Sequence, residues 1–385
     1  MTMFNTFFIG GYECADHINR SGERVNLLKE TQHDLRVYED YKALAAIGIK
    51  TVREGICWSE VEKIAGEYDF SEVYNRMKAA KTFEIQQIWD LIHFGYPDGI
   101  FPTHPLFNDR FVKLCEAFAH FYKQHSSESL FVVPINEISF LSWHSGDVRG
   151  TVPFAVNSGW DIKYHLCQAA ILGIKALKSV DPDCRIVLVE PLVKIHPGLN
   201  ENTDEIKIHN EHQFQAMDII AGRMCPELGG SEDFLDLLGF NYYWNCQWDF
   251  AAEPLPWPEI IPLRTPLSTL IEMAYQRYQK PIFLSETGHF GMGRVEWIDE
   301  IVQECLIAKT NGVDLQGICI YPVTDRPDWD DLTSFSNCGI WDLDDKGNRI
   351  PHPEYIDRII QAQTLFDNKK HGILHFIIEN FKQLI

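Results

Sequence analysis

Short runs of β-branched and aromatic residues alternate along the chain with longer segments in which apolar residues recur every three or four positions. The short runs predict strands, and the longer segments predict amphipathic helices. The eight predicted strands are Phe7–Gly11, Lys50–Cys57, Glu84–Leu91, Leu130–Ile135, Arg185–Glu190, Leu237–Tyr242, Pro281–Ser285 and Gln316–Tyr321. The clearest predicted helices are Gln32–Ile47, Asp109–His125, Ile162–Ser179, Asn210–Met224, Leu267–Tyr278 and Val295–Asn311. This alternation is typical of a parallel sheet covered by helices, so the pattern predicts an α/β fold with one (β/α)8 TIM barrel.

Nothing in the chain resembles a linker between domains. Its 385 residues would suffice for two average domains, but a barrel also occupies this length. Glycine and proline are dispersed, and no low-complexity tract or long repeat is visible. We therefore expect one domain over residues 1–385, with a helical tail at about 360–385. The amphipathic end of that tail, Gly372–Ile385, would either pack on the barrel or contact a second copy in a homo-oligomer.

Composition and charge narrow the class of partner. Hydrophobic residues make up 45% of the chain, which is enough for a large core. The 34 Lys and Arg against 55 Asp and Glu give a net charge of −21, which repels phosphate backbones and anionic lipids. Neither nucleic acid nor a membrane is therefore an expected partner, and no apolar run approaches the roughly 20 residues of a membrane span.

The cysteines and the N-terminus favour a cytoplasmic location. Ten cysteines are scattered singly, without C-x-x-C pairs or a His cluster at zinc spacing, so we interpret them as reduced core residues. The first ten residues lack a basic region and a cleavage site of the secretory kind.

Two predicted strands lead into a glutamate. Asn136-Glu137 follows the strand Leu130–Ile135, and Glu286 follows Pro281–Ser285. In a barrel the active site lies at the carboxyl ends of the strands, so strands four and seven would place these carboxyl groups on opposite sides of one pocket. Glycosidic cleavage needs such a pair, one group to protonate the leaving oxygen and one to attack or to activate water. A single glutamate would be explained equally well by a salt bridge at the barrel rim.

A basic residue, Arg53, interrupts the apolar second strand. A buried Arg needs a carboxylate partner, and Glu286 is the natural one, although Glu54 or another rim acid is an alternative. An Arg beside Glu286 would keep that carboxylate ionised, whereas an acid needs a raised pKa.

Two further strand ends carry groups that suit a sugar. His93 closes the third strand and offers a donor to a hydroxyl, although a lone His is more often structural. After the eighth strand, Tyr321, Asp328 and Trp329 combine aromatic faces with a carboxylate. Sugar rings stack on aromatic side chains, and their hydroxyls donate to Asp and Glu.

In these motifs the chain resembles the family 1 glycoside hydrolases, which are retaining, β-glucosidase-like barrel enzymes. The resemblance runs from about Phe7 to Tyr355. Its motifs are Ile49–Glu62, Gly66–Phe70, His93–Pro97, Asn136-Glu137, Gly239–Tyr243, Ser285–Gly288, Tyr321–Trp329 and Cys338–Asp344. Their order and spacing together are specific, although no single motif is.

The resemblance implies a role for each matching residue. Glu137 would be the acid/base and Glu286 the covalent nucleophile, with Arg53 and Tyr243 as hydrogen-bonding partners of Glu286. The residues implied to contact the sugar are Asn136 beside the anomeric carbon, His93 at another hydroxyl, and Asp328 with Trp329 on the far side. Neither a metal nor an organic cofactor is implied, and the substrate would be a small saccharide or glycoside.

Several positions depart from the family pattern. The family's first strand carries a Gln that binds the terminal sugar, whereas here the stretch contains Asp16 and His17, either of which could replace it. Asp328 replaces a Glu, Tyr321 replaces a Trp, and Ile138 replaces a Pro. The chain is also shorter than typical members, notably between Pro197 and Asn210 and between Trp248 and Pro266, so a more open or differently shaped substrate site is expected.

The favoured function is therefore hydrolysis of small β-glucosides, β-galactosides or related saccharides by double displacement. A transglycosidase is one alternative, because the aromatic residues Trp244, Trp248, Phe250 and Trp257 would suit a drier acceptor site. A non-catalytic sugar-binding barrel is the other, because a fold does not determine a function.

Overall fold

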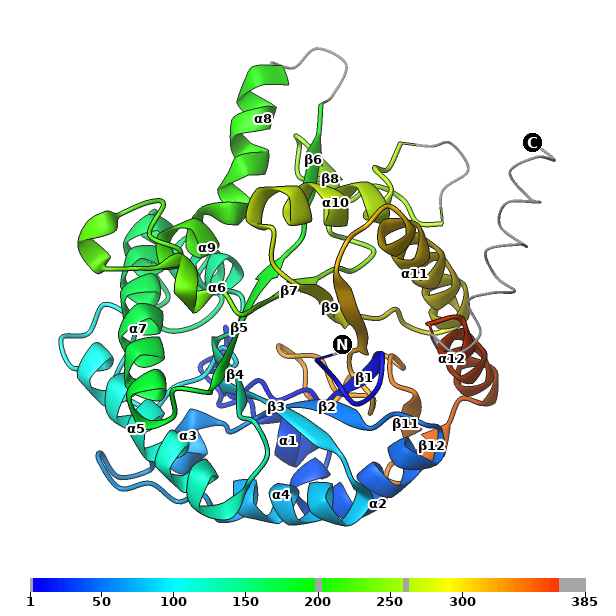
Figure 1. The fold of residues 1–385 in the computed structure, drawn as a ribbon, viewed down its shortest axis with the longest axis horizontal. Coiled ribbons are helices and arrows are strands. Elements are labelled where there is room, and N and C mark those ends of the chain that lie inside the picture. The colour runs from blue at the N-terminus through cyan, green and yellow to red at the C-terminus, as the bar shows by residue number, and fades with distance from the viewer. Residues whose placement is uncertain (1–2, 198–202, 259–262, 367–385) are drawn as a thin grey trace.

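Eight parallel strands close into a barrel in the computed structural model, which describes residues 3–197, 203–258 and 263–366 (Figure 1). The strands lie around the barrel in chain order, and the last pairs with the first. They are β1 (Phe8–Gly11), β2 (Thr51–Gly55), β3 (Gln86–Ile92), β4 (Phe131–Ile135), β5 (Arg185–Pro191), β7 (Leu237–Asn241), β9 (Ile282–Thr287) and β10 (Leu315–Ile320). This confirms the predicted (β/α)8 barrel, and each predicted strand boundary lies within two residues of the observed one.

Helices surround the barrel, as Figure 1 shows. They are α1 (Leu27–Glu30), α2 (His33–Ala46), α3 (Trp58–Val61), α4 (Ser71–Phe83), α5 (Phe107–His125), α6 (Ile138–Gly146), α7 (Gly159–Val180), α8 (Thr203–Glu211), α9 (Gln215–Ile220), α10 (Leu267–Tyr278), α11 (Gly293–Thr310) and α12 (Pro353–Phe366). Short 3-10 turns occupy His212–Phe214, Pro226–Leu228 and Glu232–Phe234.

The predicted helix Asn210–Met224 is wrong as a single element. It comprises the end of α8, the 3-10 turn at His212–Phe214, and α9. The Asn210 and Gln213 side chains bind the backbone of the segment before α8, where Ile195 N–H donates to Asn210 Oδ1 at 2.9 Å. Gly222 then adopts a φ of 78°, which a right-handed helix cannot continue.

The barrel interior is apolar over most of its height. Alternate residues of the strands point inward, and they form a buried cluster of Ile9, Ile88, Phe131, Val133, Val187, Val189, Leu237, Phe283, Cys319 and Tyr321. Phe4, which precedes β1, joins this cluster with its ring centroid 5.7 Å from that of Phe131 and 5.4 Å from that of Phe283. The N-terminal segment thereby closes the amino end of the barrel and leaves the carboxyl end for the site.

Small elements extend the barrel. β6 (Lys194–His196) pairs with β8 (Gln247–Asp249) and, with α8, projects from one side of the barrel in Figure 1. These elements lie in or beside the two segments that the sequence marks as short. A hairpin of β11 (Trp341–Leu343) and β12 (Arg349–Pro351) precedes α12, which packs beside α11. Of the predicted tail, residues 360–366 belong to α12, and the segment Gly372–Ile385 lies outside the described residues.

Two further sequence expectations can be compared with the structure. All ten cysteines are free thiols, eight of them buried and Cys225 and Cys338 partly buried. Within the described ranges, no helix combines the length and apolarity needed to cross a bilayer.

Candidate active site

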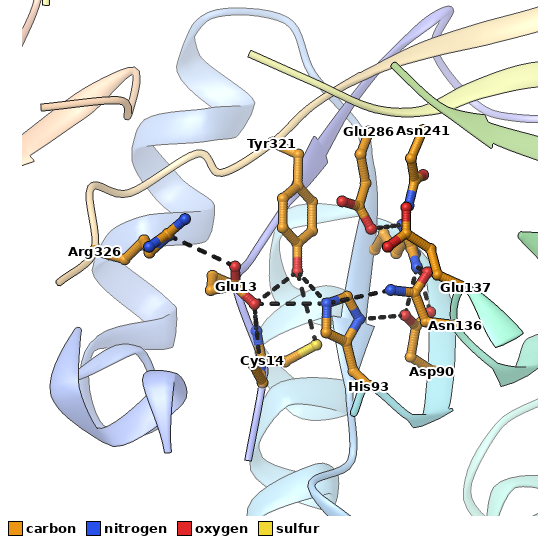
Figure 2. Close-up of polar contacts among 12 residues, drawn as sticks. Glu13, Cys14, Asp90, His93, Asn136, Glu137, Asn241, Glu286, Tyr321 and Arg326 are labelled. Carbon is orange, nitrogen blue, oxygen red and sulfur yellow. Dashed lines mark hydrogen bonds and ion pairs between the residues drawn. The ribbon is translucent and has the colours of Figure 1, made fainter. Parts of the chain in front are cut away.

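Glu137 and Glu286 meet at the carboxyl end of the barrel. Glu137 follows β4 with a φ of 46° and immediately precedes α6, whereas Glu286 is the second-to-last residue of β9. Figure 2 shows both carboxyl groups directed into the same space. Asn241 of β7 stands between them, because it is the register partner of Glu286 and its Nδ2 donates to Glu137 Oε1 at 2.9 Å. The expected pair of facing glutamates is present.

Glu286 has a hydrogen-bond donor on each carboxylate oxygen. Arg53 Nη1 donates to Oε1 at 2.7 Å, and the Tyr243 hydroxyl donates to Oε2 at 2.8 Å. Burial raises the pKa of Glu286, and the positive charge of Arg53 opposes that rise. Both bonds favour the carboxylate form and fix its orientation.

Arg53 connects Glu286 to a second buried acid that the sequence reading missed. Its guanidinium donates to both oxygens of Asp90, at 3.0 and 2.6 Å, and to Asn136 Oδ1 at 2.7 Å. Burial would raise the pKa of Asp90, but the charge of Arg53 holds it below its usual value. The alternative partner, Glu54, lies on the opposite face of β2 and binds other groups.

Glu137 lies in a different environment from Glu286. It forms no ion pair with any residue in the described ranges, and Asn241 is its hydrogen-bond donor. Burial and then the negative charge of Glu286 raise the pKa of Glu137 to about 8. Glu190 of β5 adds a further buried carboxyl group nearby, whose pKa burial raises to about 7. The surroundings of Glu137 therefore favour its protonated form, whereas the two donors on Glu286 favour its ionised form.

His93 extends the polar cluster along the barrel mouth. Its Nδ1 lies 2.8 Å from Asp90 Oδ2, and its Nε2 lies 3.2 Å from the Tyr321 hydroxyl and 3.5 Å from Asn136 Nδ2. Burial lowers the pKa of His93, but the hydrogen bond that His93 donates to Asp90 and the charge of Glu13 outweigh it, so the pKa is raised. The ring thus presents Nε2 toward the space in front of the two glutamates (Figure 2).

One combination of potential metal ligands occurs in the described part of the chain. Cys14, Asp90 and His93 have ligand atoms within 4.8 Å of one another. However, both Asp90 oxygens accept from the Arg53 guanidinium, whose positive charge opposes a cation at this point. The chemistry available here is that of two carboxyl groups and hydrogen-bond donors.

Known proteins resemble this chain in sequence and in fold. No family model matches the chain. It is 23% identical to the aryl-phospho-β-D-glucosidase BglH of Bacillus subtilis, over 69% of this chain and 67% of that one. A structure of the virulence factor SghA with its substrate analogue salicin superposes with a TM-score of 0.75 at 16% identity, covering 94% of this chain and 96% of SghA. A family 1 β-glucosidase from Thermotoga maritima gives 0.69 at 15% identity, covering 86% and 87%.

The chain is therefore similar in sequence to an aryl-phospho-β-D-glucosidase and shares the barrel fold of a family 1 β-glucosidase. Of the predicted site residues, hydrogen bonds connect six: Arg53, His93, Asn136, Tyr243, Glu286 and Tyr321. Glu137 faces this cluster and binds Asn241 beside it (Figure 2).

Two other predicted site residues, His17 and Trp329, lie in an aromatic wall beside the cluster. The ring centroids of His17 and Trp329 are 4.7 Å apart, and Phe94, Phe140 and His144 surround them. His17 Nδ1 and Trp329 Nε1 are both buried and have no hydrogen-bond partner. Burial lowers the pKa of His17 to about 3, so its ring is neutral.

Asp328 and Asp16 do not join the cluster. Asp328 is exposed, and its Oδ1 accepts from the backbone N–H of Asp330 at 2.8 Å, so the turn itself uses the carboxylate. Asp16 accepts from the backbone and hydroxyl of Ser59 instead of facing Glu286. The sugar contact of Asp328, and Asp16 as a replacement for the family's Gln, therefore stay predictions that the observed contacts of these side chains do not support.

The structure reveals Glu13 as a site residue that the sequence reading did not identify. Its carboxylate is 6% exposed and lies close to the Tyr321 hydroxyl and to Arg326 (Figure 2). The available signal was weak, because Glu13 precedes Asp16 and His17 in a loop where strand periodicity no longer decides which side chains point inward.

Proposed function

We propose that this protein is a retaining β-glycosidase that hydrolyses small β-glycosides through a covalent glycosyl-enzyme. The observation that carries the proposal is the contrast between two buried glutamates that face one space. Glu286 is held by Arg53 and Tyr243, whereas Glu137 has no ion-pair partner among the described residues and has a pKa raised to about 8. Such a contrast separates a nucleophile from an acid.

In the first step, a carboxylate oxygen of Glu286 attacks the anomeric carbon while the bond to the leaving oxygen breaks. The proton of Glu137 moves to that oxygen, so the leaving group departs as an alcohol. Arg53 and Tyr243 hold the attacking carboxylate in place, which limits the reorganisation needed at the transition state.

In the second step, Glu137 acts as the base. Once Glu286 is esterified it carries no negative charge, and that charge is one cause of the high pKa of Glu137. The pKa of Glu137 therefore falls in the intermediate, and its carboxylate takes a proton from water as the water oxygen attacks the anomeric carbon. Glu286 leaves as a carboxylate, and Glu137 is protonated again.

The remaining groups suit the hydroxyls of a sugar ring. Asn136 and His93 border the reacting carboxyl groups, which supports contacts with ring hydroxyls near the anomeric carbon. The unpartnered donors on Trp329 and the neutral His17 ring support a second set of contacts farther away. The aromatic wall offers a face on which a ring can stack.

The test is turnover of aryl β-glycosides that differ in the sugar: gluco, galacto, fuco, manno, xylo and glucuronide. A phosphorylated aryl β-glucoside belongs in the panel because BglH is named for such substrates. We expect release from at least one glycoside, with the β configuration retained in the first product. Glu286→Gln and Glu137→Gln should each lower kcat/KM at least about a thousandfold.

Glu190→Gln is the matched control, because it also neutralises a buried carboxyl group of raised pKa but one that does not contact Glu286. Its kcat/KM should stay within about tenfold of wild type. An inverted product, or a Glu286→Gln loss below tenfold, would contradict the proposal. Added alcohols distinguish hydrolysis from transfer, and sugar binding without turnover would identify a non-catalytic barrel.

A further inference from the structure

The far side of the sugar site has an acceptor that the resemblance does not predict. Asp328, the expected residue, is exposed and bound to its own turn. Glu13, from the loop after β1, instead presents a buried carboxylate on the side of Tyr321 and His93 away from Glu137 and Glu286 (Figure 2). Arg326, from the segment after β10, lies beyond Glu13 in the same view.

The two carboxylate oxygens of Glu13 are used differently. Oε1 accepts from the backbone N–H groups of Cys14 and Ala15 at 3.0 and 3.1 Å, and from the Tyr321 hydroxyl at 3.3 Å. Oε2 faces the Nε of Arg326 at 3.7 Å, which is too long for a hydrogen bond. Glu13 is thereby fixed through one oxygen and has acceptor capacity on the other.

The Nε of Arg326 is the complementary group. It is buried and has no hydrogen-bond partner, whereas Nη1 of the same side chain donates to the carbonyl of Pro327 at 3.0 Å. A buried N–H without a partner is costly, and a ligand that accepts from it removes that cost. Here such a ligand would also have to suit the adjacent carboxylate.

We propose that Glu13 Oε2 and Arg326 Nε together bind one hydroxyl of the terminal sugar, remote from the anomeric carbon, and so select the sugar. A hydroxyl fits both groups because it donates to the carboxylate and accepts from the guanidinium. A hydroxyl oxygen about 2.8 Å from both atoms forms a triangle with them, and the 3.7 Å between Glu13 Oε2 and Arg326 Nε is its base. An anionic substituent does not fit, because it would meet the Glu13 carboxylate.

The pair lies close enough to the reacting groups to act on the same sugar. The negative charge of Glu13 acts to raise the pKa of Glu286 and that of Tyr243, and Tyr243 in turn acts to raise the pKa of Arg326. The Tyr321 hydroxyl contacts both Glu13 and His93, so the pair continues the polar cluster without interruption. This inference rests on the proposed function.

Glu13→Gln is the informative variant. A Gln amide oxygen can replace Oε1 as acceptor for Cys14, Ala15 and Tyr321, while its NH2 group points toward Arg326 and can no longer accept from the hydroxyl. With the preferred aryl glycoside, kcat/KM should fall about 10- to 100-fold. Arg326→Gln should weaken turnover in the same way.

Aryl glycosides that lack one hydroxyl at a time identify the role. Wild type should lose about 10- to 100-fold on the deoxy compound that lacks the bound hydroxyl, and Glu13→Gln should show less than threefold further loss on that compound. Loss of any other hydroxyl should lower kcat/KM by the same factor in wild type and in Glu13→Gln. A Glu13→Gln enzyme equal to wild type, or one additively impaired on every compound, would overturn the proposal, as would a wild-type enzyme that prefers a glycoside phosphorylated at the bound hydroxyl to the unphosphorylated glycoside.

Asp328→Asn is the control, and its kcat/KM should stay within about threefold of wild type. Thermal unfolding of each variant checks the fold. If wild type turned over no glycoside, the proposed function would fail, and calorimetry with glucoimidazole would still test the pair. A dissociation constant at least tenfold higher for Glu13→Gln than for wild type, with an unchanged value for Asp328→Asn, would support the proposed pair. Equal dissociation constants for all three proteins would refute it.

Discussion

Glu137 and Glu286, the two glutamates that we propose react, are the same residue type and lie at equivalent strand ends, so their roles depend on their immediate neighbours. Glu286 receives hydrogen bonds from a guanidinium and a phenol, which favour its ionised form. Glu137 receives one from the neutral amide of Asn241 and faces the charge of Glu286. A proton shared by this pair therefore resides on Glu137.

This contrast predicts how activity depends on pH. The acid must be protonated in the free enzyme, so kcat/KM should decline as pH rises through about 8, the pKa of Glu137. The Asn241 amide favours the ionised form and lowers that pKa, so Asn241→Leu should move the decline upward by about one unit. A pH profile of kcat/KM measures both effects.

The control for this shift is Asn245→Leu, since Asn245 is exposed. The pH profile of Asn245→Leu should coincide with that of wild type. In Glu137→Gln the decline of kcat/KM near pH 8 should be absent, because its carboxyl group is gone. A downward shift in Asn241→Leu would show that another residue supplies the proton.

At the scale of the element, β2 directs adjacent charges to opposite faces. Arg53 points into the barrel toward Glu286, whereas Glu54 points outward, where it accepts from His33, Tyr41 and Arg76. All of these groups are buried between β2 and the helices α2 and α4. One strand therefore contributes a catalytic support on its inner face and a structural ion network on its outer face.

The outer network predicts a stability effect. Arg76 donates to Glu54 Oε2 at 2.9 Å and to the carbonyl of Gly55 at 2.7 Å. Arg76→Met would leave a buried carboxylate without its guanidinium, so the free energy of unfolding should fall by about 3–5 kcal/mol. Lys63→Met removes an ion pair whose lysine is 70% exposed, and it should cost less than about 1 kcal/mol. Urea unfolding followed by tryptophan fluorescence compares the two, and equal losses would contradict this account.

The same geometry explains what the sequence could and could not predict. The strands were recognisable because both faces of a barrel strand are buried, which gives continuous apolar runs. Arg53 was noticeable as a charge within such a run, and Asp90 in β3 carried the same signal but was overlooked. Asn241 resembles an ordinary strand-end amide until its contact with Glu137 is known. Glu13 could not be selected from a loop that also holds Asp16 and His17, because the loop path decides which of them faces the site.

For the whole molecule, the barrel separates the groups that react from much of the packing that stabilises the fold. The polar cluster occupies the carboxyl ends of the strands, and the apolar cluster around Phe4 fills the amino end. The N-terminal segment is held there by hydrogen bonds to residues near the start of two strands, from Met3 N–H to Gln316 and from Asn5 N–H to Gln86. A defect at the amino end should therefore affect stability without changing the chemistry.

Phe4→Ala tests this separation. The Phe4 side chain is 3% exposed and packs against Phe131 and Phe283, so its truncation leaves a cavity and should lower the free energy of unfolding by about 3–5 kcal/mol. The exposed Leu35, at 79%, provides the control, and Leu35→Ala should change stability by less than about 0.5 kcal/mol. Well below the unfolding temperature, kcat/KM per folded molecule should be unchanged in both variants. If Phe4→Ala lowered kcat/KM tenfold while remaining folded, the cavity would have to disturb the site through the buried cluster, which Tyr321 joins to the polar groups.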